Sequence, residues 1–405
     1  MPGPHLTLNF LAFSAIGLFA LWGIVLTNGT LPALIEAVND GFYPNGLRIH
    51  LRYTGIARVD HVLACLVAFF HIRVIAREGP PIMMVLEVAA TLLVINLFIL
   101  TESRRKDSRS CLKFPMIWAC LNHVVGTAVV FPLFAMLYVG QGHRSGTRLI
   151  NAAEAWALPV ASIVTVPMLA LLILPRLWFA LSRRPHPSPE GQISILLFFL
   201  SPVVLVGTQT VLAAIIRNLS LPPSSSSSLT VTKSGTTAAR CTQIAYLILG
   251  LLSATAHLVI CYIARFIDNT KLSSVYLPHA HGPTILRGKQ DIITKGALRF
   301  SQYDYIVTSV IIVILGLYVL LSERRLLAEA AKETSPASSN ITTVMAASPY
   351  GSVCAFLATS AVLGPGTGLA FVAIRKEQFL VTLEKSHGQA GKGSSLAACS
   401  GSTVG

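Results

Sequence analysis

PIMMVLEVAATLLVINLFIL, residues 81–100, is an apolar run that only Glu87, Thr91 and Asn96 interrupt. About 20 apolar residues in an α-helix cross the hydrocarbon core of a bilayer. In lipid, every backbone polar group needs a partner within the protein, and an α-helix provides these partners. The stretch therefore predicts a transmembrane helix.

Eight further segments have a similar composition, so the sequence predicts an all-α, polytopic transmembrane helical bundle of eight to nine helices. The segments are 10–27, 59–77, 114–139, 149–174, 192–216, 242–264, 303–321 and 346–374. Ionisable side chains interrupt the segment 59–77, and the segment 346–374 is rich in Gly and Ser. These two segments leave the expected count between eight and nine.

The same pattern predicts the domain organisation. We expect a single transmembrane domain over residues 1–375, because the apolar segments follow one another without an internal repeat. Residues 376–405 are expected to form a disordered cytosolic tail, since their end is rich in Gly, Ser and Ala and has little apolar surface to bury.

Composition excludes an ordinary soluble protein. Charged residues make up 12% of the chain, against about 25% in a typical soluble domain. The formal net charge of +14 comes from short Lys and Arg clusters between the apolar runs. Clusters in these positions are typical of juxtamembrane anchors. We therefore expect the lipid bilayer as a partner and no nucleic acid.

The distribution of basic residues predicts an orientation. With nine alternating spans, the segments on one side hold 21 Lys and Arg, and the other side, with Arg73 counted as a flanking charge, holds 10. The positive-inside rule then places the C-terminal tail in the cytosol and the N-terminus in the lumen. The sequons at Asn218 and Asn340 would lie on the lumenal side. This arrangement predicts a glycoprotein of an internal membrane, the endoplasmic reticulum.

Several chemistries have no motif in this sequence. The Asp-rich DDxxD and NxxxDxxxD motifs, which hold Mg²⁺ against a diphosphate, are absent, as is a Walker A motif. The seven cysteines are scattered without metal-ligand spacing. We therefore expect no metal and no other cofactor.

Four carboxyl side chains fall in or at the start of the predicted spans: Asp60, Glu87, Glu154 and Asp304. An acid at the membrane centre costs about 2.5–3.5 kcal/mol on insertion scales, so it usually faces the bundle interior and marks function. Desolvation favours the neutral form of such a group. A neutral carboxylic acid in an apolar pocket can protonate an epoxide or an alkene, so these four residues are the candidate catalytic acids.

Structural roles also fit some of these acids. Asp60 and Asp304 each open a predicted helix, where exposed N–H groups favour any carboxylate, and Asp60 could also pair with Arg58. Glu154 could be a structural partner within the bundle. Glu87 lies inside its span, so a position at a helix end does not explain it.

Aromatic and polar side chains near the acids are candidates for binding a substrate. Aromatic faces attract cations, including a carbocation formed by protonation. The candidates are Tyr53, Trp118, Asn122, Trp156, His257 and Tyr303.

Several phrases, in matching order from about residue 50 to 320, resemble a fungal family of membrane-bound terpene cyclases of the ascofuranone/ascochlorin type. The phrases are Tyr53-Thr54-Gly55-Ile56 with Asp60, Leu66-Val67-Ala68-Phe69-Phe70, Ala157-Leu158-Pro159, Leu272-Ser273-Ser274-Val275-Tyr276-Leu277-Pro278 and Gly296-Ala297-Leu298-Arg299-Phe300-Ser301-Gln302-Tyr303-Asp304-Tyr305. The resemblance implies metal-free, proton-initiated cyclisation of a prenylated aromatic or related meroterpenoid in fungal secondary metabolism. It also implies a small-molecule prenylated substrate as partner, and it draws attention to Gln302 and Asp304.

Two other classes of function are compatible with acids in the membrane. A small-molecule transporter or permease would be indicated by paired discontinuous helices in corresponding halves of the chain. A receptor-like or structural membrane protein would carry no chemistry. A closed, aromatic-lined cavity would distinguish a cyclase from both.

Overall fold

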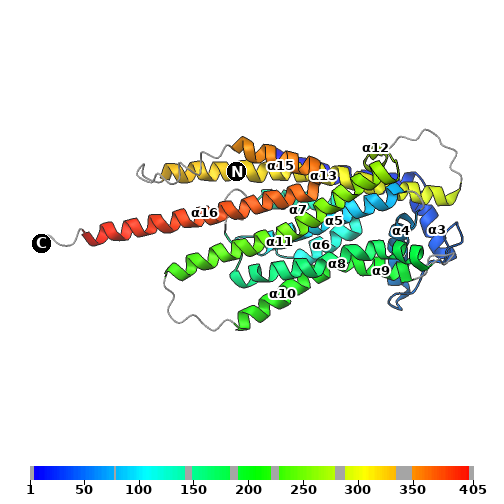
Figure 1. The fold of residues 1–405 in the computed structure, drawn as a ribbon, viewed down its shortest axis with the longest axis horizontal. Coiled ribbons are helices and arrows are strands. Elements are labelled where there is room, and N and C mark those ends of the chain that lie inside the picture. Colours follow the sequence, from blue (N-terminus) through cyan, green and yellow to red (C-terminus); the bar gives the residue numbers. More distant parts are fainter. Residues whose placement is uncertain are drawn as a thin grey trace.

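The computed structural model describes residues 4–76, 79–141, 148–182, 190–219, 228–278, 288–333 and 349–400. Within these ranges the chain is built from helices, without a β-strand (Figure 1). The helices are α1 (Pro4–Leu18), α2 (Ile24–Thr27), α3 (Thr30–Asp40), α4 (Ala57–Val74), α5 (Gly79–Ser103), α6 (Pro115–Val125), α7 (Thr127–Val139), α8 (Ala152–Ser182), α9 (Glu190–Phe199), α10 (Ser201–Leu219), α11 (Ser228–Tyr262), α12 (Leu272–Tyr276), α13 (Lys289–Glu333), α15 (Pro349–Leu363) and α16 (Pro365–Ser400).

Six helical stretches in the described part of the chain are long and apolar enough to cross a bilayer. They are His5–Thr27, Gly79–Ser103, Ala152–Leu177, Ser201–Leu219, Gly235–Ile267 and Lys289–Glu323. The predicted fold class, an all-α transmembrane bundle, is confirmed, and the chain is a multi-pass membrane protein. The count of continuous spans is lower than the eight to nine expected.

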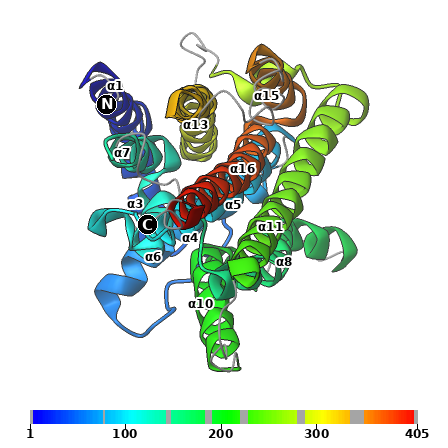
Figure 2. The same cartoon turned by 90° about the vertical axis from the view of Figure 1, so that its left-hand side faces the viewer.

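Helix α5 is the centre of this bundle. In its most apolar window, 89% of the residues are buried by other helices. It contacts α11, α13 and α16, and Figure 2 shows it behind α16 when the bundle is viewed from one end. The apolar run 81–100 therefore forms the central helix, and its polar side chains face protein.

Three of the expected spans are interrupted. The segment 114–139 breaks at Gly126, the segment 192–216 breaks at Leu200, and the segment 346–374 breaks at Gly364. Gly126 has φ +107° and Gly364 has φ +88°, a conformation that glycine adopts without the steric penalty of a side chain. Hydropathy alone did not reveal these breaks, since the flanking residues on both sides are apolar.

Two of the interrupted segments fold back as helical hairpins. In the α6–α7 hairpin, the Trp118 ring packs edge-on against Phe134 at 5.7 Å between centroids. In the α15–α16 hairpin, Arg375 Nη2 donates to Ser352 Oγ at 3.3 Å. Each pair joins residues nearly equidistant from the break, so a glycine forms the tip of each hairpin.

This topology corrects the expected alternation of nine spans. The start of α5 lies beside the end of α11, because a Cβ on Gly79 would overlap the carboxylate of Asp268. The nine-span scheme put these two ends on opposite sides of the membrane. The start of α1 and the end of α16 lie towards the same end of the bundle (Figure 1), whereas nine spans would separate them. The scheme was wrong because α4 is not among the six long spans and the two hairpins turn back, so the orientation derived from it no longer follows.

The predicted division into a domain of residues 1–375 and a tail of residues 376–405 stays a prediction. Helix α16 runs through that boundary and places the side chains of Lys376 and Glu377 inside the bundle. Asn340 and Ser220, which belong to the two predicted glycosylation sequons, lie outside the described residues.

Candidate functional site

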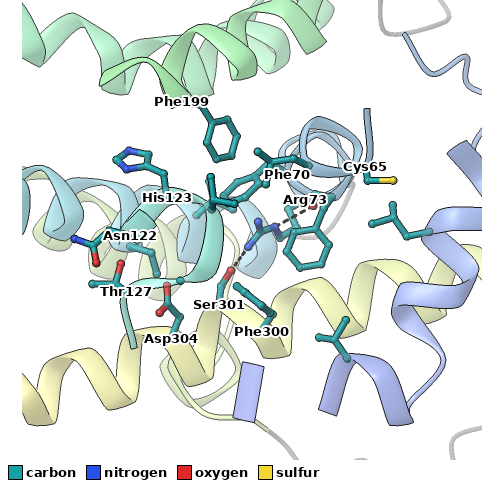
Figure 3. A pocket seen from close by; sticks show the side chains of 18 of the residues that line it. Cys65, Phe70, Arg73, Asn122, His123, Thr127, Phe199, Phe300, Ser301 and Asp304 are labelled. Atoms are coloured by element: carbon teal, nitrogen blue, oxygen red, sulfur yellow. Dashed lines mark hydrogen bonds between the residues drawn. The ribbon is translucent and has the colours of Figure 1, made fainter. Parts of the chain in front are cut away.

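A cavity of about 310 Å³ lies between α4, α5, α9, the α6–α7 hairpin and α13. Its walls are mainly aliphatic and aromatic (Figure 3). The aromatic members are Trp22, Phe69, Phe70, Phe198, Phe199 and Phe300, and the polar members include His61, Arg73, Asn122, His123, Thr127, Ser301 and Asp304. A cavity that is mostly apolar and contains a few convergent polar groups is typical of a small-molecule site.

The aromatic side chains form a continuous wall of edge-to-face contacts. The ring of Phe300 lies 5.1 Å from Phe69 and 5.8 Å from Trp22, measured between centroids. On the other side of the cavity, Phe70 lies 4.9 Å from Phe199. Edge-to-face contacts hold aromatic rings in fixed orientations, so the shape of the cavity is largely formed before a ligand enters.

Asp304 is the carboxyl group of this cavity. It lies on α13 with 5% of its surface exposed, and its Oδ1 accepts a hydrogen bond of 2.6 Å from the backbone N–H of Ala128. Ala128 is in the first turn of α7, directly after the break at Gly126. The unpaired N–H groups and the dipole of a helix N-terminus attract a carboxyl group, so the hairpin tip fixes Asp304 at the cavity wall.

Arg73 is the basic group of the cavity, and sequence reasoning misplaced it. We counted it as a flanking charge, but it is 1% exposed and its guanidinium stacks over Phe69 and Phe70, at 4.6 and 4.0 Å from the ring centroids. Its Nη1 donates to Ser301 Oγ, and its Nε donates to the carbonyl of Phe69 at 3.2 Å. Its Nη2 has no hydrogen-bond partner among the described residues. The guanidinium therefore has a donor available for a ligand.

Asn122 and His123 form part of the polar side of the cavity. The amide of Asn122, one of the expected binding residues, donates from Nδ2 to Asn96 Oδ1 at 3.4 Å. His123 has Nδ1 3.0 Å from the carbonyl of Ala119 and Nε2 3.0 Å from Ser201 Oγ. Since a carbonyl only accepts, Nδ1 carries a proton. The serine contact links the α6–α7 hairpin to the start of α10.

Glu87 and His257 meet in a second polar cluster, outside the cavity lining. Glu87 Oε1 lies 3.0 Å from His257 Nδ1, and the hydroxyl of Tyr305 donates to the same oxygen at 3.3 Å. The cluster surrounds the tip of the second hairpin, because a Cβ on Gly364 would come within 3.2 Å of both Glu87 and His257. Each glycine tip thus faces one of the acids predicted from the sequence.

Asp60 holds the loop that precedes α4. Its carboxylate accepts hydrogen bonds from the backbone N–H groups of Tyr53, Thr54 and Gly55 at 3.1, 2.6 and 3.0 Å, and from the Thr54 hydroxyl at 2.8 Å. The Thr54 N–H, followed by these other donors, lowers the pKa of Asp60 despite the opposing effect of burial. These contacts indicate a structural role for Asp60, and they hold Tyr53 beside it, away from the cavity lining.

The structure places the remaining candidates away from the cavity. Glu154 pairs with Arg217 at 3.4 Å, Gln302 donates to the carbonyls of Ser274 and Val275, and Trp156 is 52% exposed on the outer face. The Trp118 indole N–H donates to the carbonyl of Cys111. Tyr303 packs against the hydrophobic core. Of the eleven candidates, Asp304 and Asn122 line the cavity, and Glu87 and His257 meet in the second cluster.

Sequence reasoning missed most of the cavity wall. Arg73 lies four residues after Phe69 and three residues after Phe70 on α4. Both spacings bring side chains on a helix into contact. A lone arginine between apolar residues and beside two phenylalanines was the available signal. Ser301 and Phe300 stand in the phrase before Asp304, but no spacing connects them with α4.

Within the described residues, no group of three or more His, Cys, Asp and Glu side chains could hold a metal ion. The expectation that the protein needs no metal and no other cofactor stays a prediction.

The fold and the cavity define a class: a multi-pass helical membrane protein with an internal, aromatic-lined chamber that holds one acid and one guanidinium. The sequence matches the CtvD domain over residues 6–380, so the chain belongs to the CtvD domain family. No solved structure matches the chain.

Several fungal relatives carry the name terpene cyclase. Terpene cyclase DEP1 of Alternaria brassicicola is 26% identical over 331 residues, which cover 78% of this chain and 86% of that protein. Terpene cyclase alnG of Emericella nidulans is 24% identical over 88% of this chain and 90% of that protein. Terpene cyclase DEP1 of Fusarium langsethiae is 28% identical over 49% of this chain, and the match spans about half, 53%, of that relative. The expectation of an enzyme from a fungal family of membrane terpene cyclases is thereby confirmed.

Proposed function

We propose that this chain is a metal-free, proton-initiated terpene cyclase and that the cavity beside Asp304 is its active site. The observation that carries the proposal is a carboxyl group fixed by a helix N-terminus at the wall of a largely apolar, aromatic-lined chamber of about 310 Å³, which is partly open at the exposed side chains of Val62 and Val124. A chamber of this size is within the usual range for small-molecule sites, about 300–1,000 Å³.

In the proposed reaction, the protonated carboxyl group of Asp304 gives its proton to a terminal epoxide oxygen or alkene carbon of the substrate. The electron pair of a neighbouring double bond closes the ring, and a later proton loss from the cyclised cation restores neutrality. The faces of Phe199, Phe300 and Trp22 stabilise positive charge along the chain of double bonds.

Arg73 binds the oxygen-bearing part of the substrate in this scheme. Its guanidinium already occupies the faces of Phe69 and Phe70, and a fixed positive charge repels a carbocation. The cationic carbons therefore lie against Phe199, Phe300 and Trp22 and away from the guanidinium, while the free Nη2 donates to a phenol, carbonyl or epoxide oxygen. This division favours a substrate with a polar head and an isoprenoid tail, such as a prenylated aromatic or related meroterpenoid of secondary metabolism.

The experiment is product analysis with the full-length protein in membranes. We expect microsomes that contain the protein to cyclise farnesylated phenols with a terminal epoxide, detected by mass spectrometry, and we expect EDTA to leave the yield unchanged. Membranes with the Asp304→Asn variant at equal expression serve as the control. An expressed protein that forms no cyclic product from a broad substrate panel would contradict the proposal.

The site of action is proposed to be the endoplasmic reticulum membrane, because its lipid phase dissolves prenylated substrates. Fluorescence microscopy of a tagged chain against a resident marker tests this location, and treatment with a glycosidase tests whether the protein is a glycoprotein. A chain located in another membrane would refute the endoplasmic reticulum proposal.

The helix breaks favour a second candidate function, a small-molecule permease. Discontinuous helices that form a substrate site near the bilayer midplane are a feature of transporters, and the helix breaks at Gly126 and Gly364 both lie beside an acid. Proteoliposomes loaded with the substrate distinguish the two functions. A permease would release the unchanged compound, whereas a cyclase would convert it.

A further inference from the structure

A small void of about 10 Å³ lies directly behind the active-site carboxyl group. It is lined by Asp304, Tyr305, Thr91, Thr127, Thr308 and aliphatic residues of α5. Asp304 and Thr127 also line the large cavity, whereas Thr91, Thr308 and Tyr305 line only the void. The void therefore lies between the active site and the interior of the bundle.

Three hydroxyl groups around this void have no hydrogen-bond partner among the described residues. They are Thr91 Oγ1, Thr127 Oγ1 and Thr308 Oγ1, and each threonine is at most 4% exposed. A buried hydroxyl without a partner leaves its desolvation uncompensated, and three such hydroxyls surround this one void. A water molecule needs about 10–15 Å³ and two to four polar partners, which is what this void offers.

The void also adjoins the cluster around a second buried acid, Glu87. Asp304 and Tyr305 both line the void, and the Tyr305 hydroxyl donates to Glu87 Oε1 at 3.3 Å. Glu87 in turn contacts His257, and the Tyr276 hydroxyl lies 3.4 Å from His257 Nδ1. Glu87 Oε2 has no partner among the described residues. Hydrogen-bonding groups therefore follow one another from Tyr276 to the void.

We propose that the void binds one water molecule and that this water returns a proton from the Glu87–His257 pair, through Tyr305, to Asp304 after each reaction. The inference rests on the proposed function, in which Asp304 gives a proton to the substrate and must regain one. The proton held by the pair passes to the Tyr305 oxygen, while the tyrosine proton moves to the water and a water proton moves to the Asp304 carboxylate. Tyr305 and the water each accept one proton and release one, and no electrons are transferred. The Glu87–His257 pair regains its proton from solvent by way of Tyr276. This uptake of one proton balances the one proton that the cyclised cation releases.

The kinetic test separates the first reaction from the later ones. Thr91→Val and Thr308→Val, and the double variant, remove hydroxyls from the void and keep the shape of the side chain, without changing the lining of the large cavity. We expect their first turnover within about twofold of the parent and their steady-state rate reduced about tenfold or more, because proton return then limits the cycle. Thr165→Val is the matched control, since Thr165 is a buried threonine on α8 whose hydroxyl bonds to its own helix at Ala161. Unchanged steady-state rates, or an equal loss in both phases, would overturn the relay.

An infrared measurement tests the water itself without any substrate. The carboxyl stretching band that disappears in Asp304→Asn is expected to shift in the double variant and to stay in place in Thr165→Val. Tyr305→Phe, which keeps the ring, is expected to leave that band in place and to slow the steady state. A band that does not respond to the threonine changes would exclude the bound water. A parent that forms no product would remove the proposed function and the relay with it, while the infrared result would still decide whether the water is bound.

Discussion

Asp304 and Ala128, which are 176 positions apart in the sequence, are joined by a hydrogen bond of 2.6 Å from the Ala128 N–H to Oδ1 of the carboxyl group. The bond connects the long helix α13 to the tip of the α6–α7 hairpin. The tip of the α15–α16 hairpin also lies beside an acid, because a Cβ on Gly364 would come within 3.2 Å of Glu87 and His257. In both places a helix break inside the bundle lies next to an acid, and at Gly126 the break supplies a backbone N–H that binds the carboxyl group.

Replacing Asp304 with asparagine separates its chemical role from its structural one. The asparagine side chain keeps an oxygen that can accept the Ala128 N–H but has no acidic proton to give. We expect turnover to fall about 10²–10⁴-fold with little change in thermal stability, measured by product formation and by unfolding in detergent. Asp291→Asn on the same helix is the control, because Asp291 is 41% exposed and pairs with Lys295 on its own helix. Full turnover by Asp304→Asn would show that another group is the donor.

The hairpin tip at Gly126 is expected to tolerate no side chain. Its φ of +107° is strained for other residues, at a cost of about 1–3 kcal/mol, and a Cβ would overlap the side chain of Leu21. Gly126→Ala should therefore lower the unfolding temperature and, by moving Ala128, reduce activity. Gly207→Ala is the matched control: Gly207 lies in α10 with open space around it, so an alanine there should stabilise the helix by about 0.5–1 kcal/mol. Equal stability of the two variants would contradict the strained tip.

The sequence revealed the central helix and the acids but not how they combine. The apolar run around Glu87 fixed α5 as a buried helix because length and hydropathy are local properties. The break at Gly126 was invisible, since both halves are apolar and the contact that requires the break comes from α13. Arg73 was misread for the same reason: its surroundings, Ser301 and the cavity, are supplied by a helix more than 200 residues away. Hydropathy reports the medium around a helix, whereas a site depends on the contacts between helices.

Arg73 is expected to control substrate binding more than the chemical step. Lysine at this position keeps the charge but loses the planar group that stacks on two rings and holds several donors. We expect Arg73→Lys to raise KM about tenfold, equivalent to about 1.4 kcal/mol, with a smaller change in kcat. Ser301→Ala removes a single partner of the guanidinium and should have a weaker effect in the same direction. A loss confined to kcat in Arg73→Lys would show that Arg73 acts on the transition state alone.

Asp60 is expected to make the stability of the protein depend on acidic pH. Hydrogen bonds, led by the Thr54 N–H, lower its pKa in the folded state, so its contribution is complete above the unfolded value of about 3.9. That contribution is lost as the pH falls through the lower pKa of the folded state. Asp60→Asn should therefore reduce the unfolding temperature at pH 7, and the difference from the parent should shrink as the pH approaches 3. Unfolding of both proteins in detergent over this pH range measures the difference, and Asp291→Asn again serves as the control. A difference that stays constant with pH would show that the charge of Asp60 does not hold the loop before α4, and the residue would return to the list of candidate proton donors.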